Sequence, residues 1–569
     1  KGSRASDTCP VPGTRSYTMP KKREAKPLLL QNQTHKRRDR AQELRSTRRQ
    51  GVLAKRRKLD ASQAPIAAGE NQQPESWSEE QLARAVQGVK ASRIGDILPF
   101  LVDLRKLLSL EYPPVEEVVE REGLAPKLIQ LLLTPNDEIQ IEATWCLTNI
   151  ASSWSSHVKT ILDATPQLIG FLSAPNPALQ EQALWALGNI AGDSNDFREM
   201  LHANGALLPV FRLLQEPPTS EIARTAAWAI SNLARGDKTP GAPFLDVAPN
   251  VIAALRGSAE GGAARDESLR VEAAWILAFL TAKENETASA LVHAGMVPAL
   301  VEALVDSGGK DPLCTPTLRT LGNMVSGAEE WADAVMVHKE FLPCLDAVLR
   351  SQGPSQRALV KEAAWVASNV AAGRQEIREA FIAQGSPTAL TALLLSGQLD
   401  MQQEAAYGIW NLVSHDKKLL EQAVGDNKIV ETYVALLRTQ SPPAIRCALS
   451  FLQLVCQNVS GGPRIVEQAG GLEAIDDVHY SGQMDPDLQD AAGSIIDKFF
   501  GEDGYNSSDE EEADALGGGA GAFNARGTSH SSTPGPSFQL QQGQQQPVAP
   551  LGRGSHLTRP AWMNQSPSC

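Results

Sequence analysis

Residues 181–193 read EQALWALGNIAGD, and residues 142–152 read EATWCLTNIAS. Both stretches place an asparagine four positions after a tryptophan. We call the positions of this pair the ladder; its members are Trp145/Asn149, Trp185/Asn189, Trp228/Asn232 and Trp365/Asn369, with altered copies at Trp275/Phe279, Arg319/Asn323 and Tyr407/Asn411. Successive second members are 40, 43, 47, 44, 46 and 42 residues apart, which is the period of a helical solenoid of the armadillo or HEAT type.

The chemistry of the ladder suits an extended, basic ligand. Residues four apart share one face of an α-helix, so each repeat presents an indole beside a carboxamide. The amide can donate to and accept from a ligand backbone, while indoles can flank aliphatic stems and attract their cationic heads. The ladder therefore predicts binding of a peptide rich in lysine or arginine. The alternative is that the recurring tryptophan and asparagine are core and turn-capping residues of each repeat.

Acidic residues occur one helical turn before several ladder tryptophan positions. Glutamate stands there at Glu142, Glu272, Glu362 and Glu404, whereas the other copies have Gln182, Thr225 and Pro316. Such a carboxylate can form a charge-assisted hydrogen bond with a ligand cation, or it can belong to a solvated helix surface. Asp193 follows Gly192 at an expected helix end and is predicted near the rim of the ladder, with a simple turn residue as the alternative.

Composition favours a large helical protein in a reducing compartment. The chain has 569 residues, and a solenoid can grow to this size because each repeat contacts only its neighbours. No apolar run is long enough to cross a bilayer, and no signal peptide is visible. The seven cysteines show neither metal-ligand spacing nor a disulfide framework.

Charge is distributed unevenly. Residues 1–60 carry 18 Lys and Arg against 5 Asp and Glu, which leaves 35 against 61 in the remainder of the chain. A tether raises the effective concentration of the basic arm at the acidic body. A basic tail usually indicates nucleic-acid binding, but the acidic body would repel phosphate backbones, so neither nucleic acid nor membrane is an expected partner.

The chain divides into five expected segments. Residues 1–34 are predicted to be a disordered extension, 35–60 a basic binding segment and 61–76 a linker. Residues 77–505 form the solenoid, and 506–569 an acidic patch followed by a disordered low-complexity tail. Residues 39–53 favour a helix between two basic clusters; the binding positions predicted around and within it are Lys36, Arg37, Arg38, Arg45, Arg48, Arg49, Lys55, Arg56, Arg57 and Lys58.

The ladder stretches and residues 36–58 carry a resemblance over about residues 35–512 to the importin-α (karyopherin-α) family. The resemblance implies a right-handed superhelical solenoid of about ten armadillo repeats, which carries nuclear localisation signals in its groove. It implies a major signal site, where Asp193 takes the key ligand lysine, at Trp145, Asn149, Gln182, Trp185, Asn189, Asp193, Trp228 and Asn232. It implies a minor site at Arg319, Asn323, Glu362, Trp365, Asn369, Glu404, Tyr407 and Asn411.

The family resemblance also implies partners and a regulatory arm. The expected partners are importin-β, cargo proteins that bear localisation signals, and an export receptor, with shuttling between cytoplasm and nucleus. The segment at 35–60 would bind importin-β and, in its absence, would occupy the chain's own groove.

Several positions depart from the family pattern. Ser153 and Val158 replace a glycine and a threonine that assist the key ligand lysine, and a bulky Trp154 lies between them. These changes bear on lysine selectivity at that pocket. Tyr407 in place of tryptophan and Ala282 in place of an acid predict a weaker minor site.

Two other classes of protein are alternatives to an adaptor that transports cargo into the nucleus. An armadillo scaffold for other protein partners would share the solenoid, but it would line its groove with basic residues and would have no use for residues 36–58. The sequence offers no Ser/His/Asp or Cys/His pairing, Walker motif or metal motif that would indicate an enzyme. No cofactor or metal is therefore expected.

Overall fold

The computed structural model describes residues 77–501, with gaps at positions 92, 111, 237, 258–265, 352, 397, 426 and 483. This described part is built from helices, turns and short connections, and it contains no β-strand. The all-α fold expected from the repeat period is confirmed. The segments predicted at 1–34, 35–60, 61–76 and 506–569 lie outside the described residues, as does the end of the predicted solenoid beyond residue 501.

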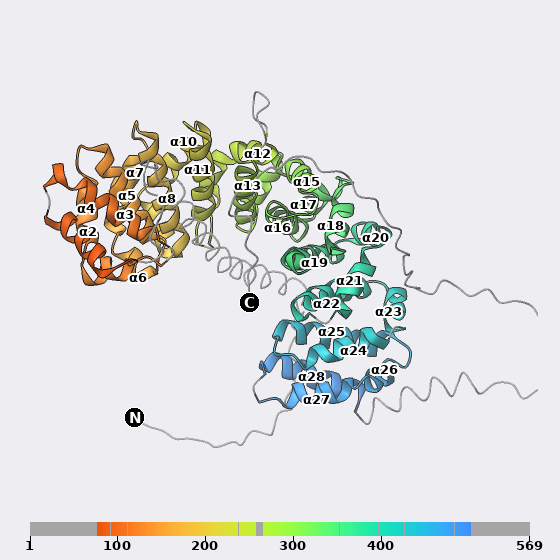
Figure 1. The fold of residues 1–569 in the computed structure, drawn as a ribbon. Helices are drawn as coiled ribbons and strands as arrows, with labels where there is room; N and C mark the ends of the chain where they lie inside the picture. The colour runs from red at the N-terminus through yellow and green to blue at the C-terminus, as the bar shows by residue number, and fades with distance from the viewer. Residues whose placement is uncertain are drawn as a thin grey trace, which may run out of the picture. The chain divides into compact units, whose positions relative to one another are not determined.

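Seven helices carry the ladder pairs, and we call these helices, together with those that continue their row at either end, the inner helices. Each inner helix contacts the next one along the chain, and they follow one another in chain order (Figure 1). Ten of them occur between residues 77 and 501: α3 (Leu98–Leu108), α5 (Asp137–Ala151), α8 (Pro177–Asp193), α11 (Ser220–Leu233), α13 (Glu267–Leu280), α16 (Cys314–Val325), α19 (Arg357–Ala371), α22 (Leu399–Val413), α25 (Pro442–Asn458) and α28 (Pro486–Phe499).

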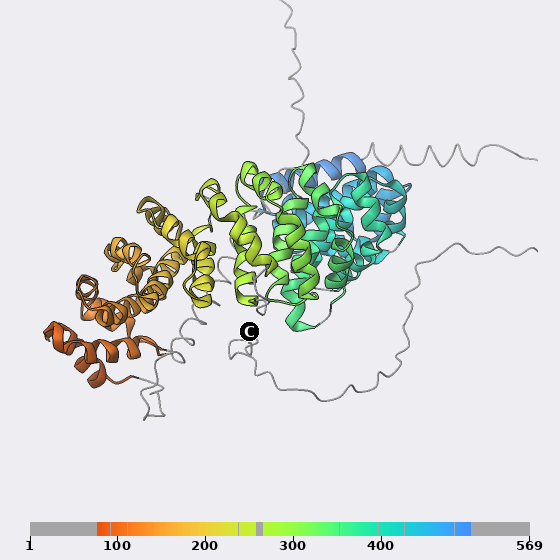
Figure 2. The ribbon, with the colours of Figure 1, turned by 90° about the horizontal axis from the view of Figure 1, so that it is seen from above.

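A second row of helices packs beside the inner helices (Figure 2). It consists of α2 (Glu79–Ala91), α4 (Ala125–Leu131), α7 (Thr165–Phe171), α10 (Leu207–Gln215), α12 (Ala248–Arg256), α15 (Met296–Ser307), α18 (Phe341–Leu349), α21 (Ser386–Leu395), α24 (Asn427–Leu437) and α27 (Gly471–Tyr480). From α12 to α27 each member also contacts its successor. Two parallel rows of contacts therefore hold that part of the stack together.

Shorter helices connect the two rows. They are η1 (Ile94–Asp96), η2 (Glu117–Arg121), α6 (Ser155–Lys159), η3 (Leu162–Ala164), α9 (Asn195–Ala203), η4 (Ala242–Val247), α14 (Asn285–His293), α17 (Glu329–Met336), η5 (Pro354–Gln356), α20 (Gln375–Ala383), α23 (Lys417–Val424) and α26 (Gly462–Gln468). Each repeat thus reads as a connector, a second-row helix and an inner helix.

The inner helices begin where the sequence supplies a capping side chain. Asn136, Thr219 and Asp266 accept a hydrogen bond from the backbone N–H three residues later, which satisfies an otherwise unpaired donor at the start of α5, α11 and α13. Pro177 and Pro486 occupy the first helical position of α8 and α28, where no intrahelical N–H bond is lost. Local sequence therefore sets where these helices start.

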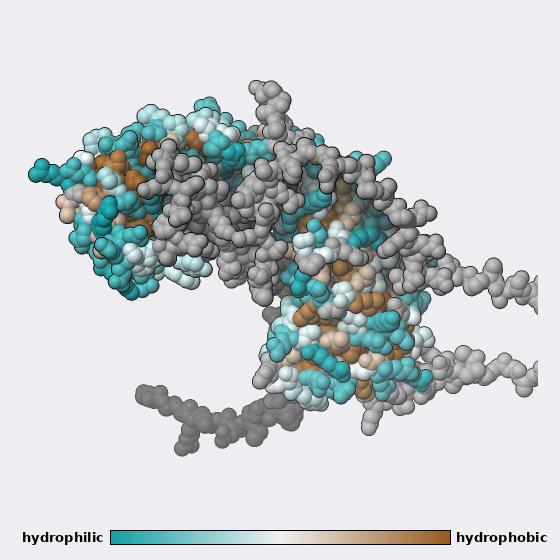
Figure 3. Space-filling view, in the orientation of Figure 1, coloured by the Kyte–Doolittle hydropathy of each residue, from teal (hydrophilic) through white to brown (hydrophobic). Residues whose placement is uncertain are grey.

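The apolar faces of the two rows meet in a continuous core. Leucine, isoleucine, valine and alanine predominate there, and the largest fully buried side chains include Phe244, Phe341, Phe381, Tyr433 and Phe451. On the outside, the face seen in Figure 3 is mostly hydrophilic, with apolar residues in small patches. Burial of apolar area along the whole stack is the main favourable term in its folding.

No single helix in residues 77–501 is long and apolar enough to span a membrane. One pair, α14 with α15, satisfies the length and composition criteria together but is bent by 77° at its break. Both members pack within the stack, where α14 and α15 contact each other and α17.

Two glycines allow neighbouring inner helices to approach closely. A Cβ atom at Gly188 would overlap Cζ3 of Trp228, and one at Gly322 would overlap Cζ3 of Trp365. In both cases the indole of one repeat lies directly on the glycine of the repeat before it. Any side chain at either glycine would have to displace a buried tryptophan.

We therefore expect Gly322→Ala to destabilise the fold. Trp365 is only 2% exposed, and overpacking of this kind typically costs about 1–3 kcal/mol. Gly170, in α7, is the matched control, because a Cβ there would meet no atom within 4 Å and alanine favours a helix over glycine by about 1 kcal/mol. Urea unfolding followed by circular dichroism should show a lower midpoint for Gly322→Ala and an unchanged or higher one for Gly170→Ala. Equal midpoints would mean that Trp365 moves aside at no cost.

Candidate functional site

Five of the six ladder asparagines tie their helix to the preceding repeat, and Asn369 is the exception. In four repeats the side-chain Nδ2 donates to a backbone carbonyl oxygen. The acceptor always belongs to the residue just before the second member of the ladder pair on the preceding helix. These hydrogen bonds run from Asn189 to Thr148 (3.2 Å), Asn232 to Gly188 (3.1 Å), Asn323 to Ala278 (3.1 Å) and Asn411 to Ser368 (2.8 Å). The regularity shows that the asparagine is part of the repeat's architecture. Only what remains of its hydrogen-bonding capacity is available to a ligand.

That remaining capacity is considerable. Asn149 Nδ2 donates to Ser109 Oγ at 3.0 Å, but its Oδ1 has no hydrogen-bond partner among the described residues, and neither has Oδ1 of Asn411. Asn369 Nδ2 is also without a partner in the described part of the chain. Buried polar atoms in native proteins are seldom left unpaired, and three of the ladder asparagines each leave one such atom unpaired among the described residues.

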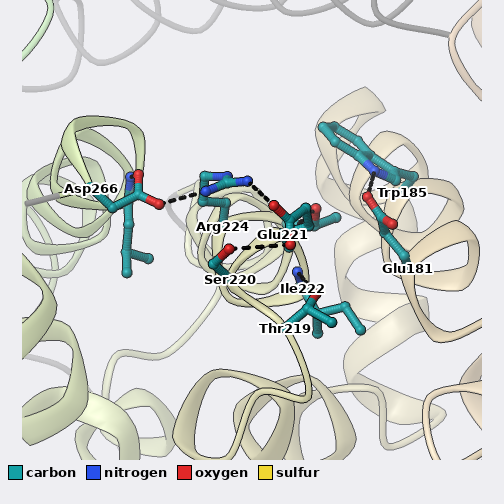
Figure 4. A network of polar contacts seen from close by, with 10 residues as sticks. Glu181, Trp185, Thr219, Ser220, Glu221, Ile222, Arg224 and Asp266 are labelled. Atoms are coloured by element: carbon teal, nitrogen blue, oxygen red, sulfur yellow. Dashed lines mark hydrogen bonds and ion pairs between the residues drawn. The ribbon is translucent and has the colours of Figure 1, made fainter. Parts of the chain in front are cut away.

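The tryptophans of neighbouring repeats lie closer together than the sequence analysis assumed. The rings of Trp185 and Trp228 have centroids 4.6 Å apart at an interplanar angle of 45°. This spacing is direct contact, so a ligand stem would lie across these two indoles and not between them. Trp185 also donates from Nε1 to Glu181 Oε1 at 3.4 Å (Figure 4).

We call the ladder residues of one repeat a rung. Arginine stands in place of tryptophan on two rungs, and both arginines are arranged alike. The Arg319 guanidinium lies over the Trp365 ring, with Cζ 5.0 Å from the ring centroid, and pairs with both carboxylate oxygens of Glu362. The position of Glu362 in the sequence predicts that it meets a ligand cation. In the structure this carboxylate already binds a cation, which belongs to the preceding repeat.

Arg105 is the second such residue, and sequence reasoning missed it. Its Cζ lies 4.4 Å from the Trp145 ring centroid, and its Nε donates to Glu142 Oε2 at 2.8 Å. Arg105 and Ser109 stand 40 residues before Trp145 and Asn149, so the repeat period alone could have revealed this first rung. It was overlooked because it contains neither tryptophan nor asparagine.

The remaining acidic and aromatic positions have mixed roles. Glu272 accepts a hydrogen bond from Ser231 Oγ at 3.0 Å, and Glu404 is buried. Tyr407 donates from its hydroxyl to the Pro443 carbonyl oxygen at 2.8 Å, and burial raises the pKa of its phenol well above the ordinary value. Tyr407 therefore remains a neutral donor and links α22 to α25.

Asp193 ends α8 and contacts α6, the connector of its own repeat. Ser155 Oγ donates to Asp193 Oδ2 at 2.6 Å. Nearby, Ser153 Oγ donates to the Ile150 carbonyl oxygen at 2.7 Å, and Val158 is fully buried. The hydroxyl of Ser155 therefore orients the carboxylate, and the two positions that depart from the family pattern are engaged in local packing.

A network of charged groups lies near the start of α11 (Figure 4). Arg224 donates to Asp266 Oδ2 at 2.6 Å and to Glu221 Oε1 at 2.8 Å, and Ser220 donates to Glu221 at 3.1 Å. Asp266 is also the capping residue of α13. The network therefore joins α11 to α13 at their N-terminal ends, and it contains none of the predicted site residues.

The predicted site residues fall into two groups of consecutive helices. The residues of the predicted major site lie on α5, α8 and α11, each of which contacts the next; those of the predicted minor site lie on α16, α19 and α22, which also contact in turn. Helix α13, with Trp275 stacked on Phe279 at 5.8 Å, separates the two groups. The predicted arm residues from Lys36 to Lys58 lie outside the described residues. No group of three or more potential metal ligands occurs among residues 77–501 outside the gaps.

Comparison with known proteins agrees with this arrangement. The Armadillo/beta-catenin-like repeat family matches residues 112–152 and 155–192. Importin subunit alpha-2 of Oryza sativa subsp. japonica is 37% identical over 418 residues, which cover 71% of this chain and 78% of that protein. Importin subunit alpha-9 of Arabidopsis thaliana is 30% identical over 453 residues, which cover 75% of this chain and 84% of that protein.

A solved structure supports the fold alone. The crystal structure of an engineered protein superimposes with a TM-score of 0.61 at 24% identity and covers 74% of this chain and 99% of that one. The stacked helices, the recurring ladder and the two plant relatives together show that the chain belongs to the importin α family.

Proposed function

We propose that this protein is a nuclear import adaptor that binds lysine- and arginine-rich localisation signals along its ladder and links them to importin-β. Membership of the importin α family supports the role of a transport adaptor in nuclear import, as opposed to an enzyme. The chain's own contacts support the finer assignment to particular residues of the ladder.

The main support is the way in which the ladder holds its own arginines. Arg105 lies over Trp145 and pairs with Glu142, and Arg319 does the same with Trp365 and Glu362. An indole beside a carboxylate one turn earlier on the same helix is thus a cation-binding unit within this fold. Cation–π attraction and a charge-assisted hydrogen bond act on the same head group. A ligand lysine or arginine would use the same chemistry on neighbouring rungs.

The spacing of the inner helices suits a ligand in extended conformation. Packed helices lie roughly 8–10 Å apart, and an extended chain advances about 3.3 Å per residue, so one rung serves about three ligand residues. Amide atoms of Asn149, Asn369 and Asn411 have no partner among the described residues, and Asn369 and Asn411 lie on the adjacent helices α19 and α22, where they would suit the backbone of such a chain. Backbone clamping of this kind does not read ligand sequence, whereas the cation-binding units select basic side chains.

The basic arm is the proposed regulatory element. Residues 36–58 would fold onto importin-β, and in its absence the cluster Lys55 to Lys58 would compete with cargo for the ladder. A coil as long as segment 61–76 would span roughly 20–25 Å, which would place the cluster at an effective concentration in roughly the millimolar range. Importin-β and cargo would then strengthen each other's binding, as linkage requires. An export receptor would return the empty adaptor to the cytoplasm, so that the protein shuttles between cytoplasm and nucleus.

The first test concerns the major site. Asp193→Lys should weaken binding of a lysine-rich signal peptide by on the order of 2–5 kcal/mol, because it replaces a charge-assisted contact by repulsion. Asp163→Lys is the matched control: the same change of charge at an exposed position of η3. Fluorescence anisotropy titration of the labelled peptide measures both, and circular dichroism checks folding, since Ser155 loses its acceptor in the variant. Unchanged affinity in a folded Asp193→Lys variant would remove Asp193 from the site.

The second test concerns the arm. Neutralising Lys55, Arg56 and Arg57 together with alanine should tighten binding of the same peptide about 10- to 100-fold, if the arm alone binds with a dissociation constant of about 10–100 µM. Lys21, Lys22 and Arg23 changed to alanine remove the same charge from a cluster outside the predicted arm, and this control should leave affinity unchanged. Should the two triple variants and the unaltered chain bind equally at moderate salt, the arm does not inhibit.

A further inference from the structure

Trp154 is an exposed tryptophan on the turn between α5 and α6. It is 77% exposed, although tryptophan is on average a highly buried residue whose burial would remove about 150–250 Å² from water. Single exposed apolar residues are common on protein surfaces. Two further features distinguish this one, namely the rigidity of its turn and its closeness to Asp193.

The turn that carries Trp154 is held from both ends. The Trp154 carbonyl oxygen accepts hydrogen bonds from the backbone N–H groups of His157 at 2.9 Å and Val158 at 3.1 Å. The buried His157 ring lies 3.1 Å from Ser153 Oγ on one side and 3.1 Å from Glu120 Oε1 on the other. The indole is therefore displayed on a fixed backbone, so little conformational entropy is lost when a ligand packs against it.

Trp154 is adjacent to the residue that holds Asp193. Ser155 Oγ lies 2.6 Å from Asp193 Oδ2, and consecutive Cα atoms are about 3.8 Å apart, so the Trp154 Cα lies within on the order of 9 Å of the carboxylate. Side chains on one face of an extended ligand are about 6.6 Å apart. A ligand side chain at Asp193 or at a neighbouring position can therefore reach the indole.

The surroundings of Asp193 favour a guanidinium over an ammonium ion. An ammonium has three donors to satisfy, whereas the Asp193 carboxylate already accepts a hydrogen bond from Ser155 Oγ at 2.6 Å. A guanidinium is more weakly hydrated, can pair with a carboxylate through two N–H groups and stacks on aromatic faces. Arg105 on Trp145 and Arg319 on Trp365 show this combination elsewhere in the molecule.

We propose that Trp154 is an additional ligand-contact residue at the Asp193 pocket, and that it makes the bound basic segment favour arginine over lysine. This inference rests on the proposed function, because it requires that a basic segment binds the ladder. Trp154 adds an aromatic face to one side of the pocket, while Asp193 supplies the carboxylate. The ligand is thereby a basic peptide in which arginine stands at or next to the position paired with Asp193.

The test compares two labelled peptides, one with an unbroken run of lysines and one with every lysine replaced by arginine. Both are titrated into the full chain and into the full chain with Lys55, Arg56 and Arg57 changed to alanine, so that the arm does not hide an effect. Trp154→Ala should weaken the arginine peptide about two- to five-fold, the range expected for an exposed cation–π contact, and should change the lysine peptide less. Trp154→Phe keeps an aromatic face and should restore most of the lost affinity.

Tyr480→Ala is the control, since Tyr480 is an equally exposed aromatic residue, 79% exposed, at the end of α27. It should leave both affinities unchanged. The inference is overturned if Trp154→Ala binds the arginine peptide as tightly as the unaltered chain, or if it weakens both peptides equally. If neither peptide binds the unaltered chain or its arm variant, the proposed function fails and this inference fails with it.

Discussion

The hydrogen bond from a ladder asparagine to the backbone of the preceding inner helix, which recurs in four repeats, is the contact on which the rest of the structure depends. A hydrogen bond of this type contributes only about 0.5–1.5 kcal/mol net, but leaving its buried partner unpaired costs about 1–3 kcal/mol. Because Asn189, Asn232, Asn323 and Asn411 all use the same acceptor position, each repeat has a defined register on its neighbour. The tryptophans and glutamates of successive repeats are thereby brought into one row.

Close approach of the helices reinforces this register. Trp228 lies on Gly188 and Trp365 on Gly322, so the same indoles that face the ladder also pack against the preceding repeat. Each repeat of a solenoid contacts only its neighbours, and the stability of the stack is a sum of terms within and between neighbours. The ladder residues therefore hold adjacent repeats together, and they bring aromatic and acidic side chains into one row. The sequence offers a ligand-binding role and a core role for these residues as alternatives. The contacts between repeats show that a role in packing does not exclude a role in ligand binding.

The repeat period, the helical class and the positions of the ladder could all be read from the sequence. The spacing of Asn149, Asn189 and Asn232 along the chain predicts where α5, α8 and α11 lie. The four-residue interval between the tryptophan and the asparagine of each pair fixes which face of the helix they share. What lies opposite that face was not predictable. Glu142 and Glu362 were expected to meet ligand cations, yet their partners are Arg105, 37 residues earlier, and Arg319, 43 residues earlier. Periodicity shows which residues share a face, whereas the pairing of side chains depends on the packing of neighbouring repeats.

The two stacked arginines also have a consequence for any ligand that lies along the ladder. If all rungs were alike, an extended basic chain could shift by one rung at no cost in energy, and its position would be degenerate. Arg105 and Arg319 already pair with the carboxylates of two cation-binding units, on α5 and α19. The rungs are therefore unequal, and a basic ligand of the proposed kind would have to displace these arginines or place its own cations elsewhere. The positions of the two arginines would in this way set where the ligand lies along the ladder.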